Sequence, residues 1–401
     1  MLEFEEALAR VLAAVPATTI EYVSLSGSAG RVLAEQVRSP IDLPVFDNSA
    51  MDGYGLRAAD VASAKPDSPA RLRLAGRIAA GEVFAGKVTA GTCVRLFTGS
   101  PLPAGADAVV MQEDTLVEPG APGEVLILAP AVPGENVRSR GGDVKRGSTI
   151  VSAGEFLTAG RIGLLAAAGM TGVRVGRQPT VGLLATGSEL QEPGQPLAPG
   201  RVYESNRLAL AVLTGRAGAV PRTFPLVTDE LAATSRALEE ACSQCDAVVT
   251  TGGVSVGEMD FIRRAFEQTG GELEFWKVAI KPGRPFAFGR RRGALLFGLP
   301  GNPVSALVTF LLLVRPALLR WQGAANASLP VLPGVLAEPL VNIGGRRHFM
   351  RVRMDSTGKV YSAGVQASHI LSSVAAANGL VDVPPDTTLS AGAAVSVLHW
   401  D

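Results

Sequence analysis

The sequence is poor in the side chains with which many enzymes form covalent intermediates. Its 401 residues include three cysteines and three histidines, and His348, His369 and His399 all lie in the C-terminal part of the chain. No Ser–His–Asp or Cys–His arrangement is visible, so we do not expect a covalent enzyme intermediate. Cys242 and Cys245 form a C-x-x-C pair without a second pair, which favours reduced, partly buried thiols over a zinc or redox site.

The chain also lacks an excess of charge of either sign and a long apolar run. Lysine plus arginine and aspartate plus glutamate both number 37, so the formal net charge is zero. No bulk field attracts nucleic acid or an anionic membrane, and any anion site must be local. The longest apolar run, Val304 to Val314, is too short to span a bilayer, and the acidic, amphipathic N-terminus is unlike a signal peptide. We therefore expect a cytoplasmic protein with no nucleic-acid or membrane partner.

What the chain does have is many turn residues and a pattern that changes along its length. It contains 46 glycines and 27 prolines, and 47% of its residues are hydrophobic, as in folded globular proteins. A chain of this length exceeds a single hydrophobic core. The patterns predict four parts: a discontinuous N-terminal domain (1–44 and 145–177), an inserted small β-rich module (45–144), a central α/β domain (178–327) and a C-terminal β-barrel-like domain (328–401).

In the discontinuous domain, apolar residues at helical spacing predict helices over residues 3–14 and 158–168. Tyr22 to Leu25 is expected to be a strand, and Ala29 to Leu33 a second short helix. From residue 70 to 127, short alternating runs separated by glycine and proline predict the strands of the inserted module.

From Thr180 onward, short apolar strands alternate with helical segments. This order predicts a doubly wound α/β domain, with a parallel sheet covered by helices on both faces. Asp229 is placed to cap a helix that runs to Ala241, and Asn302 to cap a helix that has Pro303 at its first position.

The stretch from Asp246 to Asp260 is the clearest candidate for a ligand site in this domain. A buried strand, Ala247 to Val249, leads into the loop Thr250-Thr-Gly-Gly, and a helix begins at Phe261. Backbone N–H groups and a helix N-terminus at the end of a strand suit an anionic ligand, and nearby carboxylates can hold a metal ion. The alternative is a solvated strand-to-helix connection.

Three other loops are expected at the same sheet edge, because parallel strands end together. They are Thr186-Gly-Ser-Glu, Lys281-Pro-Gly-Arg and Leu299-Pro-Gly-Asn-Pro. The edge would then combine N–H groups, two cationic side chains and two or three carboxylates. That combination fits a phosphorylated ligand with a divalent cation.

A second group of polar residues lies in the inserted module. Asp47, Asn48, Ser49 and Asp52 fall within six residues, and Thr98 follows a later strand. This set is denser than one turn needs, although turn chemistry remains the alternative.

Seven motifs, occurring in order along the chain, resemble those of the MoeA family of molybdopterin molybdenumtransferases, to which the gephyrin E-domain is related. The motifs are Asp47-Asn-Ser-Ala-Met-Asp-Gly-Tyr, Phe97-Thr-Gly-Ser-Pro-Leu-Pro, Val110-Met-Gln-Glu, Thr186-Gly-Ser-Glu-Leu, Thr251-Gly-Gly-Val-Ser-Val-Gly-Glu-Met-Asp, Lys277-Val-Ala-Ile-Lys-Pro-Gly-Arg-Pro and Gly298-Leu-Pro-Gly-Asn-Pro-Val-Ser.

The resemblance implies an elongated homodimer that inserts molybdate into molybdopterin. The donor would be adenylyl-molybdopterin, the by-product AMP, and the cation Mg²⁺ or a similar divalent ion. The cleft would lie between the α/β domain of one subunit and the β-module of the other. Contact with molybdopterin adenylyltransferase and with maturation proteins of molybdoenzymes is also expected.

The resemblance also implies site residues. Glu189 and Asp260 would hold the metal, while Lys277, Lys281 and Arg351 would attract molybdate. Positions matching the family's catalytic residues are Asp52, Thr98, Asp143, Asp229, Lys277 and Lys281. Expected substrate-binding residues are Thr251, Gly252, Gly253, Ser255, Arg284, Pro300, Asn302, Pro303, Arg351 and Ser372.

Two positions depart from the family pattern. Ser188 stands where an aspartate is frequent, which removes one carboxylate near the proposed metal. Arg284 stands where a lysine is frequent, which keeps the charge and adds bidentate geometry for an oxyanion.

Two other functions remain open. A molybdopterin adenylyltransferase would share the α/β domain, but the added N- and C-terminal parts argue against it. A non-catalytic scaffold is the other alternative, and no long disordered linker is visible in its support.

Overall fold

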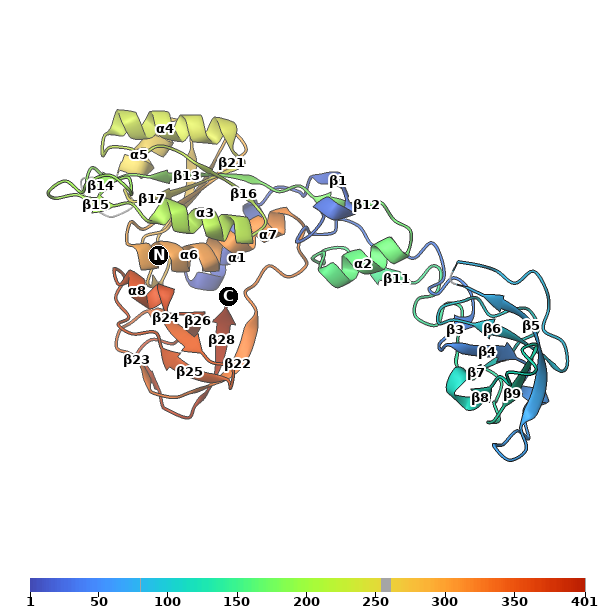
Figure 1. The fold of residues 1–401 in the computed structure, drawn as a ribbon. Coiled ribbons are helices and arrows are strands. Elements are labelled where there is room, and N and C mark those ends of the chain that lie inside the picture. The colour runs from blue at the N-terminus through green and yellow to red at the C-terminus, as the bar shows by residue number, and fades with distance from the viewer. Residues whose placement is uncertain (80, 254–260, 401) are drawn as a thin grey trace.

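The structure, a computed structural model, describes residues 1–79, 81–253 and 261–400. The molecule is elongated, with the α/β and C-terminal domains together at one end and the β-module at the other (Figure 1). A narrow N-terminal domain connects the two ends. This arrangement confirms the fold class predicted from the sequence.

The N-terminal domain is built from chain on both sides of the β-module. β1 (Ile20–Ser24) pairs antiparallel with β12 (Gly172–Gly176), and β2 (Val37–Arg38) pairs with β11 (Thr149–Val151). α2 (Ala159–Ala167) packs beside them.

Two expectations about this domain are wrong. Residues 29–33 form no helix: Val32 and Leu33 make isolated bridges to Phe156 and Val175, because this backbone pairs with chain from beyond the insert. α1 (Phe4–Ala14) is a helix as predicted, but its buried Ala7 and Val11 belong to the core of the α/β domain.

The β-module contains a six-stranded sheet with its own hydrophobic core. The strand order is β7-β4-β6-β5-β9-β8. Its strands are β4 (Gly53–Leu56), β5 (Ala70–Ile78), β6 (Thr92–Leu96), β7 (Ala108–Met111), β8 (Thr115–Leu116) and β9 (Glu124–Ile127). β3 (Asn48–Ser49) pairs with β10 (Val137–Arg138) where the chain enters and leaves the module.

The α/β domain has a six-stranded sheet, in the order β16-β13-β17-β21-β20-β18. The first four strands are parallel, whereas β20 runs in the opposite direction and pairs antiparallel with both β21 and β18. The prediction of a wholly parallel sheet is therefore wrong at one edge. The strands are β16 (Val220–Thr223), β13 (Thr180–Ala185), β17 (Ala247–Thr251), β21 (Ala294–Leu299), β20 (Ala287–Arg291) and β18 (Glu272–Trp276).

Helices cover both faces of this sheet, as a doubly wound fold requires (Figure 1). α4 (Leu231–Gln244) and α5 (Phe261–Gln268) lie on one face. On the other lie α3 (Asn206–Arg216) and a continuous helical stretch made of α6 (Pro303–Thr309), a π-helical turn (Phe310–Val314) and α7 (Arg315–Trp321). Among the described residues, this stretch is the one helix that is long and apolar enough to cross a membrane. However, 83% of its apolar segment is buried inside the protein. It is a core helix of the α/β domain.

The C-terminal domain is a small closed barrel, because β24 pairs with both β25 and β26. The sheet order is β19-β24-β25-β22-β28-β26. Its strands are β19 (Ile280–Lys281), β22 (Val331–Leu336), β24 (Arg347–Met354), β25 (Lys359–Ser362), β26 (Gly379–Val383) and β28 (Ala394–His399), with β23 (Leu340–Asn342) paired to β27 (Thr387–Leu389) and a short α8 (Leu371–Ala375).

Candidate active site

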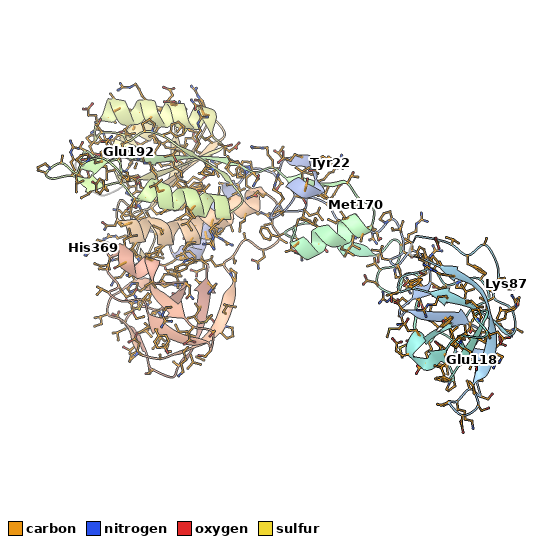
Figure 2. All side chains as sticks on the ribbon, in the orientation of Figure 1. Tyr22, Lys87, Glu118, Met170, Glu192 and His369 are labelled. Atoms are coloured by element: carbon orange, nitrogen blue, oxygen red, sulfur yellow. The ribbon has the colours of Figure 1, made fainter. Side chains whose placement is uncertain are left out.

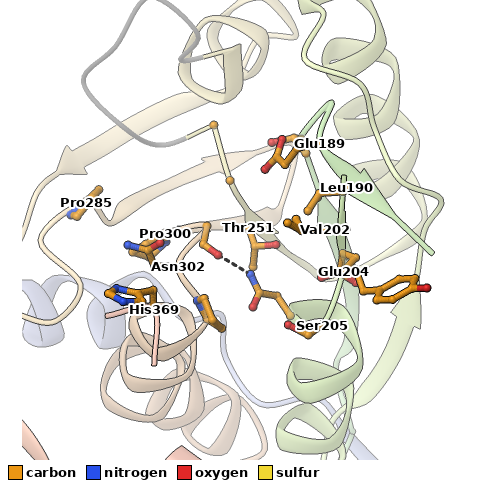
Figure 3. A pocket seen from close by; sticks show the side chains of 17 residues that line it. Glu189, Leu190, Val202, Glu204, Ser205, Thr251, Pro285, Pro300, Asn302 and His369 are labelled. Atoms are coloured by element: carbon orange, nitrogen blue, oxygen red, sulfur yellow. Dashed lines mark hydrogen bonds between the residues drawn. The ribbon is translucent and has the colours of Figure 1, made fainter. Parts of the chain in front are cut away.

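A pocket of about 660 Å³ opens at the carboxyl ends of β13, β17 and β21 (Figure 3). This is the edge at which ligands bind in doubly wound sheets. The pocket is lined by Thr186, Glu189, Leu190, Val202, Tyr203, Glu204, Ser205, Asn206, Thr251, Gly252, Gly253, Pro285, Pro300, Gly301, Asn302, Pro303 and His369. Seven of the predicted site residues line it: Glu189, Thr251, Gly252, Gly253, Pro300, Asn302 and Pro303.

The turn after β17 requires glycine for two reasons. Gly252 has a φ of 86° and Gly253 a φ of 63°, values that residues with a Cβ rarely adopt. A Cβ on Gly252 would also lie 2.2 Å from the Thr186 carbonyl oxygen. The turn therefore lies directly against the loop after β13, where Thr186 N donates to Thr251 O at 3.0 Å. The predicted residues Ser255 and Asp260 lie outside the described part of the chain.

Glu189 and Asp229 have different roles in the loop after β13. Glu189 is exposed in the pocket. Asp229 does not line the pocket and does not cap α4, whose N-cap residue is Glu230. Instead its carboxylate accepts a hydrogen bond from Ser188 N at 2.9 Å, while Asp229 N donates to Ser188 Oγ at 3.1 Å. The expected helix cap is therefore wrong, because Asp229 holds the loop that carries Glu189.

Asn302 occupies the N-cap position of α6, with Pro303 following it as predicted. Its side chain does not cap the helix, however, so that expectation is wrong. Asn302 Nδ2 donates instead to Ser368 Oγ of the C-terminal domain at 2.9 Å. On the other side of the loop, Asn206 Nδ2 donates to Gly301 O at 2.8 Å, the dashed line in Figure 3.

In the β-module, Asp52 and Thr98 come together although 46 residues separate them. Asp52 Oδ1 accepts hydrogen bonds from Thr98 N at 2.7 Å and from Thr98 Oγ1 at 2.8 Å. The backbone N–H of Thr98, followed by its hydroxyl, holds the pKa of the Asp52 carboxyl below its usual value. Asp143 is exposed at the base of the module, where its backbone N donates to Leu43 O.

Three family models match the chain, each over one part of it. They are the MoeA N-terminal region (domains I and II) over residues 2–169, a probable molybdopterin binding domain over 182–320, and the MoeA C-terminal region (domain IV) over 333–400. The molybdopterin molybdenumtransferase of Haemophilus influenzae is 39% identical and aligns over 99% of this chain and 98% of its own. Molybdopterin molybdenumtransferase 2 of Mycobacterium tuberculosis is 40% identical over 94% of each chain.

This chain belongs to the MoeA family. A crystal structure of a molybdopterin biosynthesis MoeA protein from Pyrococcus horikoshii superimposes with a TM-score of 0.87 at 31% identity, covering all of both chains. The same family architecture, including the separation of the two ends, is thus shared with a solved relative.

In this MoeA chain, the β-module residues and the pocket residues are at opposite ends. Figure 2 shows Glu192 and His369 near the pocket end, and Lys87 and Glu118 on the module at the far end. Asp52, Thr98 and Asp143 belong to the module end, so one chain does not bring them to the pocket.

The predicted cationic residues also lie outside the lining of the pocket. Lys277 and Lys281 are half-buried, and Arg284 is exposed next to the lining residue Pro285. Lys281 is in β19, which pairs with β24 of the barrel. Ser372 is exposed at the start of α8.

Arg351 is fully buried, contrary to what a direct role in attracting molybdate would suggest. Its Nε donates to Ser373 Oγ at 2.8 Å and its Nη2 to Val365 O at 2.9 Å. Burial lowers the pKa of its guanidinium to about 10. In this structure Arg351 therefore organises the loop before α8.

Several lining residues were missed by the sequence reasoning, among them Tyr203, Glu204, Asn206 and His369. Glu204 is buried beside the pocket, where its Oε2 accepts from Arg207 Nε at 2.9 Å. Glu204 precedes Arg207 by three residues at the start of a helix, a spacing at which opposite charges pair. This spacing could have indicated the ion pair from the sequence. His369 lies in the polar stretch Ser368-His-Ile-Leu-Ser-Ser, whose polar side chains are the local signal for it.

Cys242 and Cys245 are free thiols, as expected, and both are buried; Cys93 is also free and buried. Desolvation, the largest influence, raises the pKa of the Cys242 thiol to about 11. Among the residues that the structure describes, no group of three or more His, Cys, Asp and Glu side chains could hold a metal ion.

Proposed function

We propose that this protein inserts molybdenum into molybdopterin, using adenylyl-molybdopterin and molybdate and releasing AMP, in molybdenum cofactor biosynthesis. The observation that carries the proposal is the pocket at the sheet edge, where the Gly252–Gly253 turn and Glu189 face one space. Its volume of about 660 Å³ lies within the usual range of small-molecule sites. The names of the relatives, molybdopterin molybdenumtransferases, support the same reaction.

In this proposal the turn after β17 accommodates the phosphate region, because its glycines let the backbone approach a ligand closely. Leu190, Val202 and Tyr203 contribute an apolar part of the pocket lining, against which a ring system can pack.

Glu189 is the described residue that fits a divalent cation such as Mg²⁺. Mg²⁺ prefers oxygen ligands and commonly takes one or two carboxylates together with substrate phosphates. When bound, it supplies neutralisation of the charge that develops on the phosphates. Asp260 is the second carboxylate expected from the family resemblance.

The separation of the two ends supports a homodimer in which each cleft uses both subunits. Asp52 and Thr98 would come from the partner's β-module and close the pocket. Exposed apolar side chains beside this pair favour such an interface: Val45 is 45%, Phe46 42% and Met51 41% exposed.

The proposed reaction is tested by incubating the protein with adenylyl-molybdopterin, Mg²⁺ and molybdate and following AMP release. We expect release that molybdate stimulates and that Glu189→Gln reduces by at least about tenfold, because a metal ligand is lost. Adenylylation of molybdopterin from ATP would instead identify an adenylyltransferase. Binding of the pterin without any release would indicate a scaffold.

The shared cleft is tested by mixing two inactive variants, Asp52→Asn and Glu189→Gln, under conditions of subunit exchange. In a mixed dimer one cleft carries both changes and the other carries neither. Random exchange should therefore restore about one quarter of the wild-type activity, since half of the dimers are mixed. If mixing restores no activity while exchange is confirmed by mass spectrometry, the shared cleft is wrong.

The cellular location of the protein and its protein partners are also proposals. We propose that it acts in the cytoplasm, receives its substrate from molybdopterin adenylyltransferase and passes its product to maturation proteins of molybdoenzymes. Pull-down with the purified adenylyltransferase would test the first of these contacts.

A further inference from the structure

The pocket has an uneven distribution of charge. Of its described lining residues, Glu189 and Glu204 are acidic, and His369 is the one side chain there that can carry a positive charge. Figure 3 shows His369 beside Asn302 and Pro300, across the pocket from Glu189 and Leu190. Glu204 is paired with the buried Arg207, so Glu189 is the exposed carboxylate of the pocket. An oxyanion that is not bound through a metal at Glu189 is repelled from that side, and on the side of His369 it meets an N–H donor.

The loop that carries His369 is held in place on its N-terminal side by the buried Arg351. Arg351 Nη2 donates to Val365 O at 2.9 Å and to Ala367 O at 3.3 Å. These bonds fix the backbone up to two residues before the imidazole. Arg351 itself is completely inaccessible to solvent, so it acts on the loop and not on a ligand.

Two further contacts hold the other parts of this loop. Ser368 Oγ accepts from Asn302 Nδ2 at 2.9 Å, which ties the loop to the N-terminus of α6. After the histidine, Ser373 Oγ donates to Ile370 O at 2.6 Å and accepts from Arg351 Nε at 2.8 Å. His369 is thus an exposed side chain on a backbone fixed at both ends, which is the arrangement expected of a ligand contact.

We propose that His369 is a substrate contact whose imidazole N–H donates a hydrogen bond to a tetrahedral oxyanion in the pocket, the molybdate or a phosphate group. Either tautomer of the neutral ring, as well as the charged ring, provides an N–H donor. Ser368 is a positioning residue, because its bond to Asn302 ties the loop that carries His369 to the N-terminus of α6. This inference rests on the function proposed above.

The experiment uses the full chain and five proteins: wild type, His369→Ala, His369→Gln, Ser368→Ala and the control His399→Ala. His399 belongs to the same domain but does not line the pocket. Binding of molybdate alone and of AMP alone is measured by calorimetry, and AMP release is measured as a function of molybdate. The melting curves of the two His369 variants should match that of the wild type, because His369 is exposed.

We expect His369→Ala to weaken binding of one oxyanion by about tenfold, the usual effect of losing a hydrogen bond to a charged group. A change for molybdate identifies molybdate as the partner, and a change for AMP identifies the phosphate. His369→Gln, which keeps an N–H donor, should recover part of the affinity, and Ser368→Ala should lose less than His369→Ala.

If the His369→Ala variant binds both anions with the affinity of the wild type, the inference is wrong and the proposed function is unaffected. A wild-type protein that binds neither anion and releases no AMP would overturn the proposed function, and the inference with it. The two failures are distinguished because one concerns the variant and the other the wild type.

Discussion

At the scale of single residues, the candidate site depends on side chains whose partners are distant in sequence. Asp52 bonds to Thr98, Asp229 to Ser188, and Asn302 to Ser368. Local spacing suggested helix caps for Asp229 and Asn302, because caps are the partners that nearby backbone offers. The polar residues could therefore be found from the sequence, whereas their partners could not.

The Asp52–Thr98 contact makes a prediction about pH. A carboxyl whose pKa is lower in the folded protein stabilises it above the unfolded pKa, and this contribution is lost as the pH falls through the folded value. Thr98→Val removes the hydroxyl donor and should raise the pKa of Asp52 toward its ordinary value. As the pH is lowered, the loss of activity should then begin at a higher pH in Thr98→Val than in the wild type. The titration of the Asp52 carboxyl, followed by NMR, should shift to higher pH in the same way. Thr98→Ser keeps the hydroxyl, and an equal shift in that variant would contradict the explanation.

The turn after β17 makes a second prediction at this scale. Gly252→Ala should destabilise the protein by more than about 2 kcal/mol, because a left-handed φ and a backbone clash act together. Gly200 provides a matched control, since its φ is 76° and no atom lies within 4 Å of an added Cβ. Gly200→Ala should cost about 1 kcal/mol in chemical denaturation. Equal costs at the two positions would show that the close approach to Thr186 does not matter.

At the scale of elements, the strands and turns of the α/β domain were predictable because apolar runs end sharply at glycine-containing loops. β13, β17 and β21 and their loops formed the pocket edge as expected. The reversed direction of β20, between β21 and β18, was not predictable, because a short apolar strand carries no information about its direction. The part that Val202 and Tyr203 play in the pocket lining was also missed, and a buried ion pair directly follows these two residues in the chain.

That ion pair connects the pocket wall to α3. The side chain of Arg207 is 4% exposed and that of Glu204 is 2% exposed. Arg207 also donates to Phe224 O at 2.5 Å and to Glu192 at 2.7 Å. One buried arginine thus joins α3, the segment before it and the loop after β14 (Leu190–Gln191).

Arg207→Met should destabilise the protein by about 3–5 kcal/mol, because it leaves the Glu204 carboxylate buried without its partner. Adding Glu204→Gln should recover much of this loss, because the uncompensated charge is removed. Urea denaturation of the wild type, both single variants and the double variant measures the coupling. A double variant that is as unstable as the sum of the single changes would show that the two residues do not act as a pair.

At the scale of the whole molecule, the β-module is set apart from the pocket and has its own core. Its buried residues, such as Leu56, Val94 and Ile127, form clusters that include only residues of the module. No sequence pattern reports the distance between such separate bodies, and only the family resemblance suggested that a second subunit closes the pocket. The direction in which the module projects therefore determines whether a shared cleft can form.

Asp42 lies where the chain enters the module and joins the entering segment to the leaving one. Its Oδ1 accepts from Arg146 N at 2.8 Å, and its Oδ2 accepts from Arg140 Nε at 2.7 Å. The backbone N–H of Arg146, followed by the Arg140 guanidinium, lowers the pKa of the Asp42 carboxyl. Asp42 thus connects the segment of the chain that enters the β-module to the segment that leaves it.

Asp42→Ala should leave each domain folded but widen the range of module orientations. We expect a larger radius of gyration in small-angle scattering. If the module completes the cleft of a partner subunit, as proposed, we also expect molybdate-stimulated AMP release to fall by about tenfold. Asp67→Ala, a change at an exposed carboxylate elsewhere in the module, is the control. Unchanged activity together with a larger radius of gyration would mean that the orientation of the module does not determine catalysis, and that Asp52 and Thr98 act outside the pocket.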